Sequence, residues 1–202
     1  KDYHVLWKLN KKKHKKNIED HKRSALSNYD KYKQSSADDP YEQLSYLIPC
    51  FESVLRSLGI DFTKEGTGED LPVEIPKILR SIISGFELNG KNSFEGVMRR
   101  PLDDDIIVRL SYTPGSGNVF GPKRALNPNK IPISISFTEG RGKLSSATIS
   151  TDRSGISKFE MVEISPVATY TLFFAFIDLK RFRTMGDFEK FDEELDKISK
   201  DR

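Results

Sequence analysis

Two small groups of residues have types that could do chemistry, a pair of histidines near the start of the chain and three consecutive aspartates in its middle. His14 and His21 are seven residues apart, so one face of a helix would carry both. Zinc sites on helices use ligands four residues apart together with a third ligand, and the surrounding lysines would repel a cation. We therefore expect these histidines to be surface residues and predict no metal site here.

Asp103, Asp104 and Asp105 resemble a cluster for a hard cation, because calcium binds several carboxylate and carbonyl oxygens. Three acids before a strand are also typical of a solvated turn, and the sequence has no Asp-x-Asp-x-Asp-Gly pattern. Whether calcium binds at this point stays open. A thermal melt with millimolar calcium would decide it, since a ligand that binds the native state must stabilise that state.

The other candidate motifs indicate turns rather than catalytic groups. Gly115–Gly117 and Gly140–Gly142 would lie between strands, so neither has the helix N-terminus that a phosphate-binding loop requires. Asp152 and Asp178 are expected at turns or strand ends and not as a catalytic pair. The sequence shows no nucleophile elbow and no Cys/His couple. It therefore predicts no catalytic, metal-binding or cofactor-binding residue, no small-molecule substrate and no enzyme activity, and it leaves the binding residues unknown.

Basic charge is concentrated at the start of the chain. The net charge is +3, but residues 1–34 hold eleven Lys or Arg against four Asp or Glu, and the rest holds twenty-two against twenty-six. Such a stretch is typical of a solvated helix face, and it can also contact nucleic acid or an anionic membrane. No base-stacking aromatic residues alternate with Lys11–Arg23, so nucleic acid is the less favoured partner.

Cys50 is the only cysteine, which excludes an intrachain disulfide and a cysteine-based metal cluster. Its neighbours Ile48 and Phe51 indicate a small buried side chain. The longest apolar run, Leu172–Ile177, has the length of a strand and is far shorter than the roughly 20 residues of a membrane span. Because the chain opens on Lys1 rather than on methionine, we expect it to be part of a longer or processed protein.

Helices are predicted before the strands begin. Apolar residues spaced by three, four and seven indicate a basic helix over Lys11–Gln34. Asp39, followed by proline and by Glu42, should cap a second helix, which should bend at Pro49 and end at Gly59. Because only a short connection separates them, these two helices should form an antiparallel hairpin. A third helix is expected over residues 71–84.

The strands are predicted from alternating apolar residues with turn signals between them. They are Phe86–Leu88, Phe94–Met98, Ile106–Tyr112, Ile131–Phe137, Leu144–Ser150, Ile156–Val162 and Thr169–Leu179. Short strands in this number fit an immunoglobulin-like sandwich. A final helix should begin near Thr184, and its apolar stripe should pack on the sandwich, with binding of a partner as the alternative. The stripe comprises Met185, Phe188, Phe191, Leu195 and Ile198.

These elements define an α+β chain of four parts. Residues 1–10, with the strand-type run Tyr3–Leu9, would be the remnant strand of a truncated upstream domain. Residues 11–84 would form the helical segment, residues 85–182 the immunoglobulin-like antiparallel β-sandwich, and residues 183–202 the C-terminal amphipathic helix. A sandwich of this kind positions, spaces or adheres more often than it catalyses.

The strand region resembles the bacterial immunoglobulin-like repeat, over residues 86–180. The likeness is carried by Ile131–Phe137, Gly140, Gly142, Thr151–Gly155, Ala175 and Asp178. Ser157 stands where the repeat often has alanine. The start of the chain resembles a second family, since Tyr3–Leu9 followed by a long charged helix is similar to the end of the domain in the bacterial twenty-kilodalton lipoproteins. This second resemblance implies an envelope lipoprotein, in the periplasm or at the outer membrane, whose lipid-bearing N-terminus would lie upstream of Lys1.

The function that we predict is therefore a non-enzymatic structural, assembly or spacer module of the cell envelope, with envelope proteins as partners and with no cofactor. Membrane contact would come only through the missing lipid anchor. Two alternatives stay open. The first is an adhesion module whose sandwich loops, above all Thr113–Lys130, bind a glycan or a protein. The second is nucleic-acid binding through the basic helix, which would weaken steeply with salt.

Overall fold

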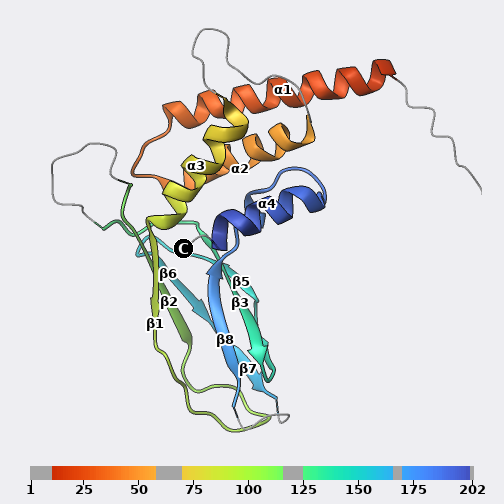
Figure 1. Cartoon of the computed structure of the whole chain (residues 1–202). Helices are drawn as coiled ribbons and strands as arrows, with labels where there is room; N and C mark the ends of the chain where they lie inside the picture. Colours follow the sequence, from red (N-terminus) through yellow and green to blue (C-terminus); the bar gives the residue numbers. More distant parts are fainter. Residues whose placement is uncertain (1–10, 58–69, 116–124, 166–169, 201–202) are drawn as a thin grey trace, which may run out of the picture.

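The computed structural model describes residues 11–57, 70–115, 125–165 and 170–200. Within these ranges the helices gather at one end of a set of antiparallel strands (Figure 1). The helices are α1 (Lys11–Gln34), α2 (Pro40–Arg56), α3 (Leu71–Ser84), the 3-10 helix η1 (Leu179–Phe182) and α4 (Glu189–Lys200). The strands are β1 (Phe86–Gly90), β2 (Ile106–Tyr112), β3 (Pro132–Glu139), β4 (Gly142–Leu144), β5 (Thr148–Ser150), β6 (Ile156–Phe159), β7 (Met161–Ile164) and β8 (Leu172–Ile177).

The described strands form three small sheets, with the orders β1-β2-β6, β5-β3-β8 and β4-β7. This mixture of helix and strand confirms the predicted α+β class. An immunoglobulin-like sandwich is not confirmed, because the strands are divided among three sheets. Strand β2 shows the predicted alternation, with Ile106, Val108, Leu110 and Tyr112 buried.

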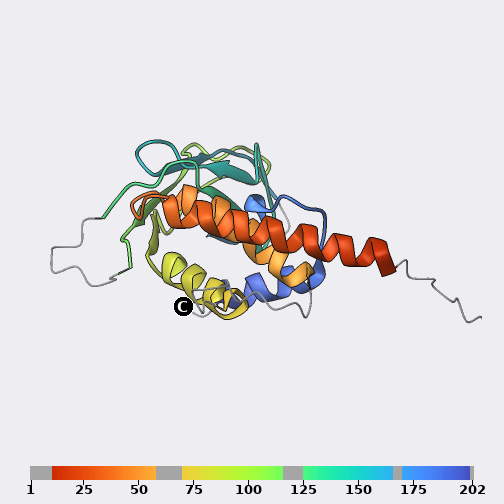
Figure 2. The same cartoon turned by 90° about the horizontal axis from the view of Figure 1, so that it is seen from above.

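Helices α1 and α2 lie side by side, joined by residues 35–39, as the hairpin prediction requires (Figure 2). The Asp39 carboxylate caps α2, because it accepts a hydrogen bond from the backbone N–H of Glu42 at 3.0 Å. Helix α2 continues through Pro49, and the bend expected there stays a prediction. The helix ends at Arg56, whereas the predicted stop at Gly59 lies outside the described residues.

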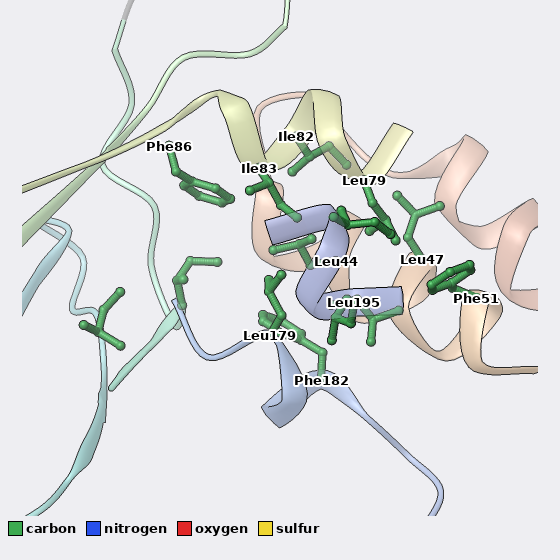
Figure 3. Packing of buried hydrophobic residues seen from close by; sticks show 14 of the residues in the cluster. Leu44, Leu47, Phe51, Leu79, Ile82, Ile83, Phe86, Leu179, Phe182 and Leu195 are labelled. Atoms are coloured by element: carbon green, nitrogen blue, oxygen red, sulfur yellow. The ribbon is translucent and has the colours of Figure 1, made fainter. Parts of the chain in front are cut away.

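The core begins between the helices and continues into the strands (Figure 3). The buried residues shared by this junction are Leu44, Leu47, Phe51, Leu79, Ile82, Ile83, Phe86, Leu179, Phe182 and Leu195. Phe51 of α2 and Phe191 of α4 are in ring contact, with centroids 5.9 Å apart. The C-terminal stripe is therefore packed, but mainly on α2 and α3 rather than on a sandwich.

Helix α4 begins at Glu189, five residues later than the predicted start at Thr184. The reason lies in the segment that precedes the helix. The Arg56 guanidinium donates a hydrogen bond to the backbone oxygen of Gly186 at 2.6 Å, so that oxygen is bonded to α2 rather than within a helix. Arg183 also forms ion pairs with Asp187 and Asp192.

The strand predicted over Phe94–Met98 is absent from the structure. The backbone N–H of Arg100 donates to the Val97 oxygen at 3.1 Å, which closes a turn where a strand would have to continue. Val97 and Met98 point to solvent, with exposed fractions of 61% and 46%. Only Phe94 packs inward, so the apolar composition of this segment does not mark a buried strand.

Two predicted strands are each divided in the structure. Leu144–Ser150 separates into β4 and β5, and Ile156–Val162 separates into β6 and β7. The chain changes sheet at both breaks, because β4 pairs with β7 whereas β5 pairs with β3 and β6 pairs with β2. The backbone N–H of Ser145 donates to the Glu160 oxygen at 3.0 Å and so connects the two breaks. Alternation along the sequence does not reveal such a change of partner.

Candidate functional site

The structure does not bring the sequence-predicted polar candidates together. His14 is exposed and His21 is half-buried on α1. Asp103, Asp104 and Asp105 are all exposed before β2, and Asp104 forms an ion pair with Lys91, with 3.2 Å between the carboxylate oxygen and the ammonium nitrogen. Across the described ranges, no three His, Cys, Asp or Glu side chains are placed to share a metal ion.

Asp152 and Asp178, which are predicted at turns or strand ends, lie in a turn and directly after a strand. Asp152 accepts backbone hydrogen bonds from Ile156 at 3.0 Å and from Ser154 at 2.8 Å, and these bonds lower the pKa of its carboxyl group. The same turn contains Gly155 at φ +72°, where a Cβ atom would come within 2.4 Å of the Leu110 oxygen. Asp178 instead follows β8 and accepts a hydrogen bond from the Ser134 hydroxyl at 3.1 Å.

Cys50 is fully buried, as expected, and burial raises the pKa of its thiol to about 12. A thiol of this kind is a core residue rather than a nucleophile. Gly140 lies in the turn between β3 and β4 at φ +69°, a backbone conformation that glycine adopts more easily than other residues, so it has a structural role in the turn. Gly115 is described before the long loop, whereas Gly117 lies outside the described residues.

The most distinctive surface is a seam between two strand edges. Strand β1 pairs with β2 on one side, and β8 pairs with β3 on one side. No described strand pairs with the other edge of either one. Two cavities, of about 300 and 430 Å³, lie along the gap, and Leu88 of β1 and Ala175 of β8 line both of them. We call this gap the β1/β8 seam.

Strand β8 forms an apolar rim of the seam. Its outward residues Leu172, Phe174 and Phe176 are 49%, 48% and 37% exposed. The rings of Phe174 and Phe176 are 5.5 Å apart, so they present one continuous aromatic surface. Proteins usually protect such an edge with a charge, a proline or a bulge in the edge strand, and the six residues Leu-Phe-Phe-Ala-Phe-Ile contain neither a charge nor a proline.

The inner face of β8 fixes the strand in place. Phe173 contacts the rings of Phe137 and Phe94, with centroid distances of 6.2 Å in both cases. Along most of its length β8 pairs in antiparallel register with β3, as in the pair Ile135 and Ala175. The exposed edge is therefore held by a packed sheet and is not a frayed end.

Strand β1 forms the opposite rim and is polar. Glu87 and Asn89 are exposed, and Leu88 is half-buried against the core. Just beyond the strand, the Lys91 ammonium lies 5.0 Å from the centroid of the Phe94 ring. The seam thus has one charged rim and one apolar rim.

Sequence reasoning predicted a strand over Thr169–Leu179 that includes this apolar run, but it made no prediction about the edges of that strand and so missed the site. A run that is apolar on both faces is typical of a strand covered on both sides. The signal that could have pointed to the edge is the length of the run combined with its position as the last strand before a helix. Only the pairing shows that no described strand covers one of its edges.

A second surface is the basic helix α1. Residues 13–17 are exposed on every side, and this N-terminal end of α1 projects beyond α2 (Figure 1; Figure 2). Its packing face starts later, with Ala25 and Tyr29 buried against α2. Among the described helices, none combines the length and the apolar composition that crossing a bilayer requires.

Comparisons with family models, with curated proteins and with solved structures found no match to this chain.

Proposed function

We propose that this chain is a non-enzymatic assembly module that binds an extended segment of a partner protein along the open edge of β8. The observation that carries the proposal is the uncharged, aromatic edge of a well-packed strand, which pairs with none of the strands that the structure describes. Backbone N–H and C=O groups on such an edge form hydrogen bonds with an added strand, and the neighbouring pockets take its side chains.

The geometry of the seam defines what the partner segment should look like. Side chains alternate along a strand, so an added strand would place every second side chain toward the cavities that Leu88 and Ala175 line. Those positions should be apolar beside Leu88 and Ala175 and polar beside Asn89 and Lys91. The opposite side chains would extend the aromatic surface of Phe174 and Phe176, where apolar or aromatic residues also fit best.

A peptide-binding experiment tests this function. The probe is a labelled synthetic peptide with the sequence of residues 131–139, because this strand has side chains that already fit beside β8 on its paired edge, and in the folded chain only the other edge is available to the peptide. We expect saturable binding, seen by fluorescence anisotropy, and at least a tenfold loss of affinity in Phe174→Lys. A control peptide with proline at positions 134 to 137 lacks the backbone donors on both edges of the strand and should not bind.

Val73→Lys is the matched control variant. Val73 is an apolar residue of α3 with an exposed fraction of 47%, close to the 48% of Phe174, and it does not line the seam. The variant should bind the peptide like the wild type. Equal losses in both variants would show that added charge alone weakens binding, and that result would contradict the proposal.

Envelope location and a lipid anchor are part of the same proposal only through the family resemblance. The test is the reading frame upstream of Lys1. A signal peptide that ends in a lipid-modifiable cysteine would support placement in the envelope, and a start without a signal would contradict it.

The projecting N-terminal end of α1 favours a second candidate function, the binding of nucleic acid through phosphate contacts. Lysines on several sides of a helix that has few packing partners can neutralise phosphates. Affinity for a short duplex would then fall linearly with the logarithm of the salt concentration, and the double variant Lys15→Gln/Lys16→Gln would reduce that slope. An affinity that does not depend on salt would contradict it.

A further inference from the structure

A polar cavity of about 320 Å³ lies where α2, β3, β5 and η1 meet, away from the β1/β8 seam. Its lining contains two cationic side chains, Lys130 and Arg181, and the hydroxyl groups of Tyr41, Thr148 and Ser150. No carboxylate belongs to the described lining. Cations and hydroxyl groups are the donors that proteins use to bind oxyanions, so the composition of the cavity is that of an anion site.

The Arg181 side chain is 64% exposed and has two polar contacts beside the cavity. Its Nε atom lies 3.5 Å from a carboxylate oxygen of Asp178, and its Nη2 atom donates to the Thr148 hydroxyl at 3.4 Å. The Ser134 hydroxyl connects this pair, because it contacts both Thr148 at 2.7 Å and Asp178 at 3.1 Å. A guanidinium has five N–H donors, so several remain for a ligand after these two contacts.

Lys130 adopts an unusual backbone conformation at the mouth of the cavity. Its φ is +65°, a region where glycine is favoured and a lysine is strained. The backbone is fixed by a hydrogen bond from the Lys130 N–H to the Thr151 oxygen at 2.8 Å. The ammonium nitrogen lies 5.6 Å from the centroid of the Tyr41 ring. The sequence thus keeps a cation at a position where glycine would be more stable.

The surroundings direct a ligand to one side of Lys130. A neighbouring cavity of about 240 Å³ also contains Lys130 but is lined by Asp38 and Asp39. These carboxylates would repel an anion. The side that contains Arg181 is the one with net positive charge, because Asp178 offsets only one of the two cations.

We propose that this cavity binds the phosphate group of a small phosphate ester, between Lys130 and Arg181. A phosphate accepts hydrogen bonds from both cations and from the Ser150 hydroxyl, whereas the single hydroxyl proton of Thr148 is directed to Ser134, which donates its own to Asp178. The volume exceeds that of a phosphate ion alone and falls at the lower end of the range for ligand sites. Tyr41 and Phe182, with ring centroids 5.6 Å apart, supply an apolar wall for the organic part of the ester.

The experiment uses the whole chain and three probes at constant ionic strength: glucose 6-phosphate, inorganic phosphate and glucose. Binding is followed by amide chemical shifts, which also locate it. We expect glucose 6-phosphate to bind saturably, more tightly than inorganic phosphate, with shifts at Lys130, Thr148 and Arg181. Glucose should not bind. Constant ionic strength keeps general charge screening from imitating a site.

The sharpest variant is Lys130→Gly, which removes the cation and also relieves the backbone strain. The melting temperature should rise while affinity for glucose 6-phosphate falls at least tenfold. Arg99→Gly is the matched control, since Arg99 is the other described non-glycine residue with positive φ, at +62°, and it does not line the cavity. It should also gain stability but should bind the ester like the wild type.

Three results would overturn the proposal. They are the absence of saturable binding by the wild type, shifts confined to the α1 lysines, and equal affinity of the wild type and Lys130→Gly. Equal affinity for inorganic phosphate and for glucose 6-phosphate would overturn the ester as the ligand. Lys130→Gly should lose ester binding but keep peptide binding at β8. The two binding experiments can therefore fail independently, and this test is distinguishable from that of the proposed function.

Discussion

The two rims of the seam belong to the same core but present opposite chemistry to solvent. Strand β1 exposes Glu87 and Asn89, whereas β8 exposes Leu172, Phe174 and Phe176. Both strands have an edge that no described strand covers. A charged edge discourages the addition of another strand, and an apolar one permits it. The difference indicates that the molecule protects one edge and leaves the other available.

The largest expected effect comes from removing the core that both rims share. Phe159 is fully buried and pairs with Ile106 in the sheet behind β1. Phe159→Ala should lower the free energy of unfolding by about 3–5 kcal/mol, through lost burial and a cavity. Urea denaturation measures it, with Ile107→Ala, a 44% exposed position, as the control. A loss below about 1 kcal/mol would show that this core does not support the rims.

Alkaline pH should lower the free energy of unfolding through Tyr112 of β2, which pairs with Phe86 of β1, whereas β8 has no titratable side chain. Burial, with contributions from Tyr32 and Asp38, raises the pKa of Tyr112 from 10.0 to about 12. The folded state therefore keeps a proton that the unfolded chain loses. Stability should fall between about pH 10 and 12, by at most about 1.4 kcal/mol per pH unit.

Tyr112→Phe should remove this part of the pH dependence. The comparison is made in a Cys50→Ala background, because burial also raises the pKa of Cys50 from 9.0 to about 12 and gives a separate fall from about pH 9. Urea denaturation from pH 8 to pH 11 is the measurement. If the free energy of unfolding fell with pH at the same slope with and without Tyr112, the pKa of its hydroxyl group would be the same in the folded and unfolded chain, and the prediction would be wrong.

Exchanging the chemistry of the two rims should have the smallest effect on stability and a clear effect on association. Phe174→Lys gives β8 a protected edge, and Glu87→Leu gives β1 an apolar one. Both positions are exposed, so each change should alter the free energy of unfolding by less than about 1 kcal/mol. Sedimentation at high protein concentration should show less association for Phe174→Lys and more for Glu87→Leu. If the two variants associated to the same extent, the proposed difference between the two rims would be wrong.

The sequence predicted the elements whose signals are local. The Asp39 cap, the helix over residues 71–84 and the alternation of β2 depend on neighbouring residues, and all three are present. The divided strands depend on which distant strand is the partner, and local alternation carries no such information. The candidate sites follow the same rule. The open edge of β8 and the cavity between Lys130 and Arg181 arise only when separate segments meet.

Hydrogen exchange of the backbone amides, resolved by NMR with and without the peptide of residues 131–139, tests the central claim most directly. The account predicts that the peptide slows exchange of amides in Leu172–Ile177 and leaves those of Phe86–Gly90 at their former rates. Protection confined to β1, or protection of neither strand at saturating peptide, would contradict it.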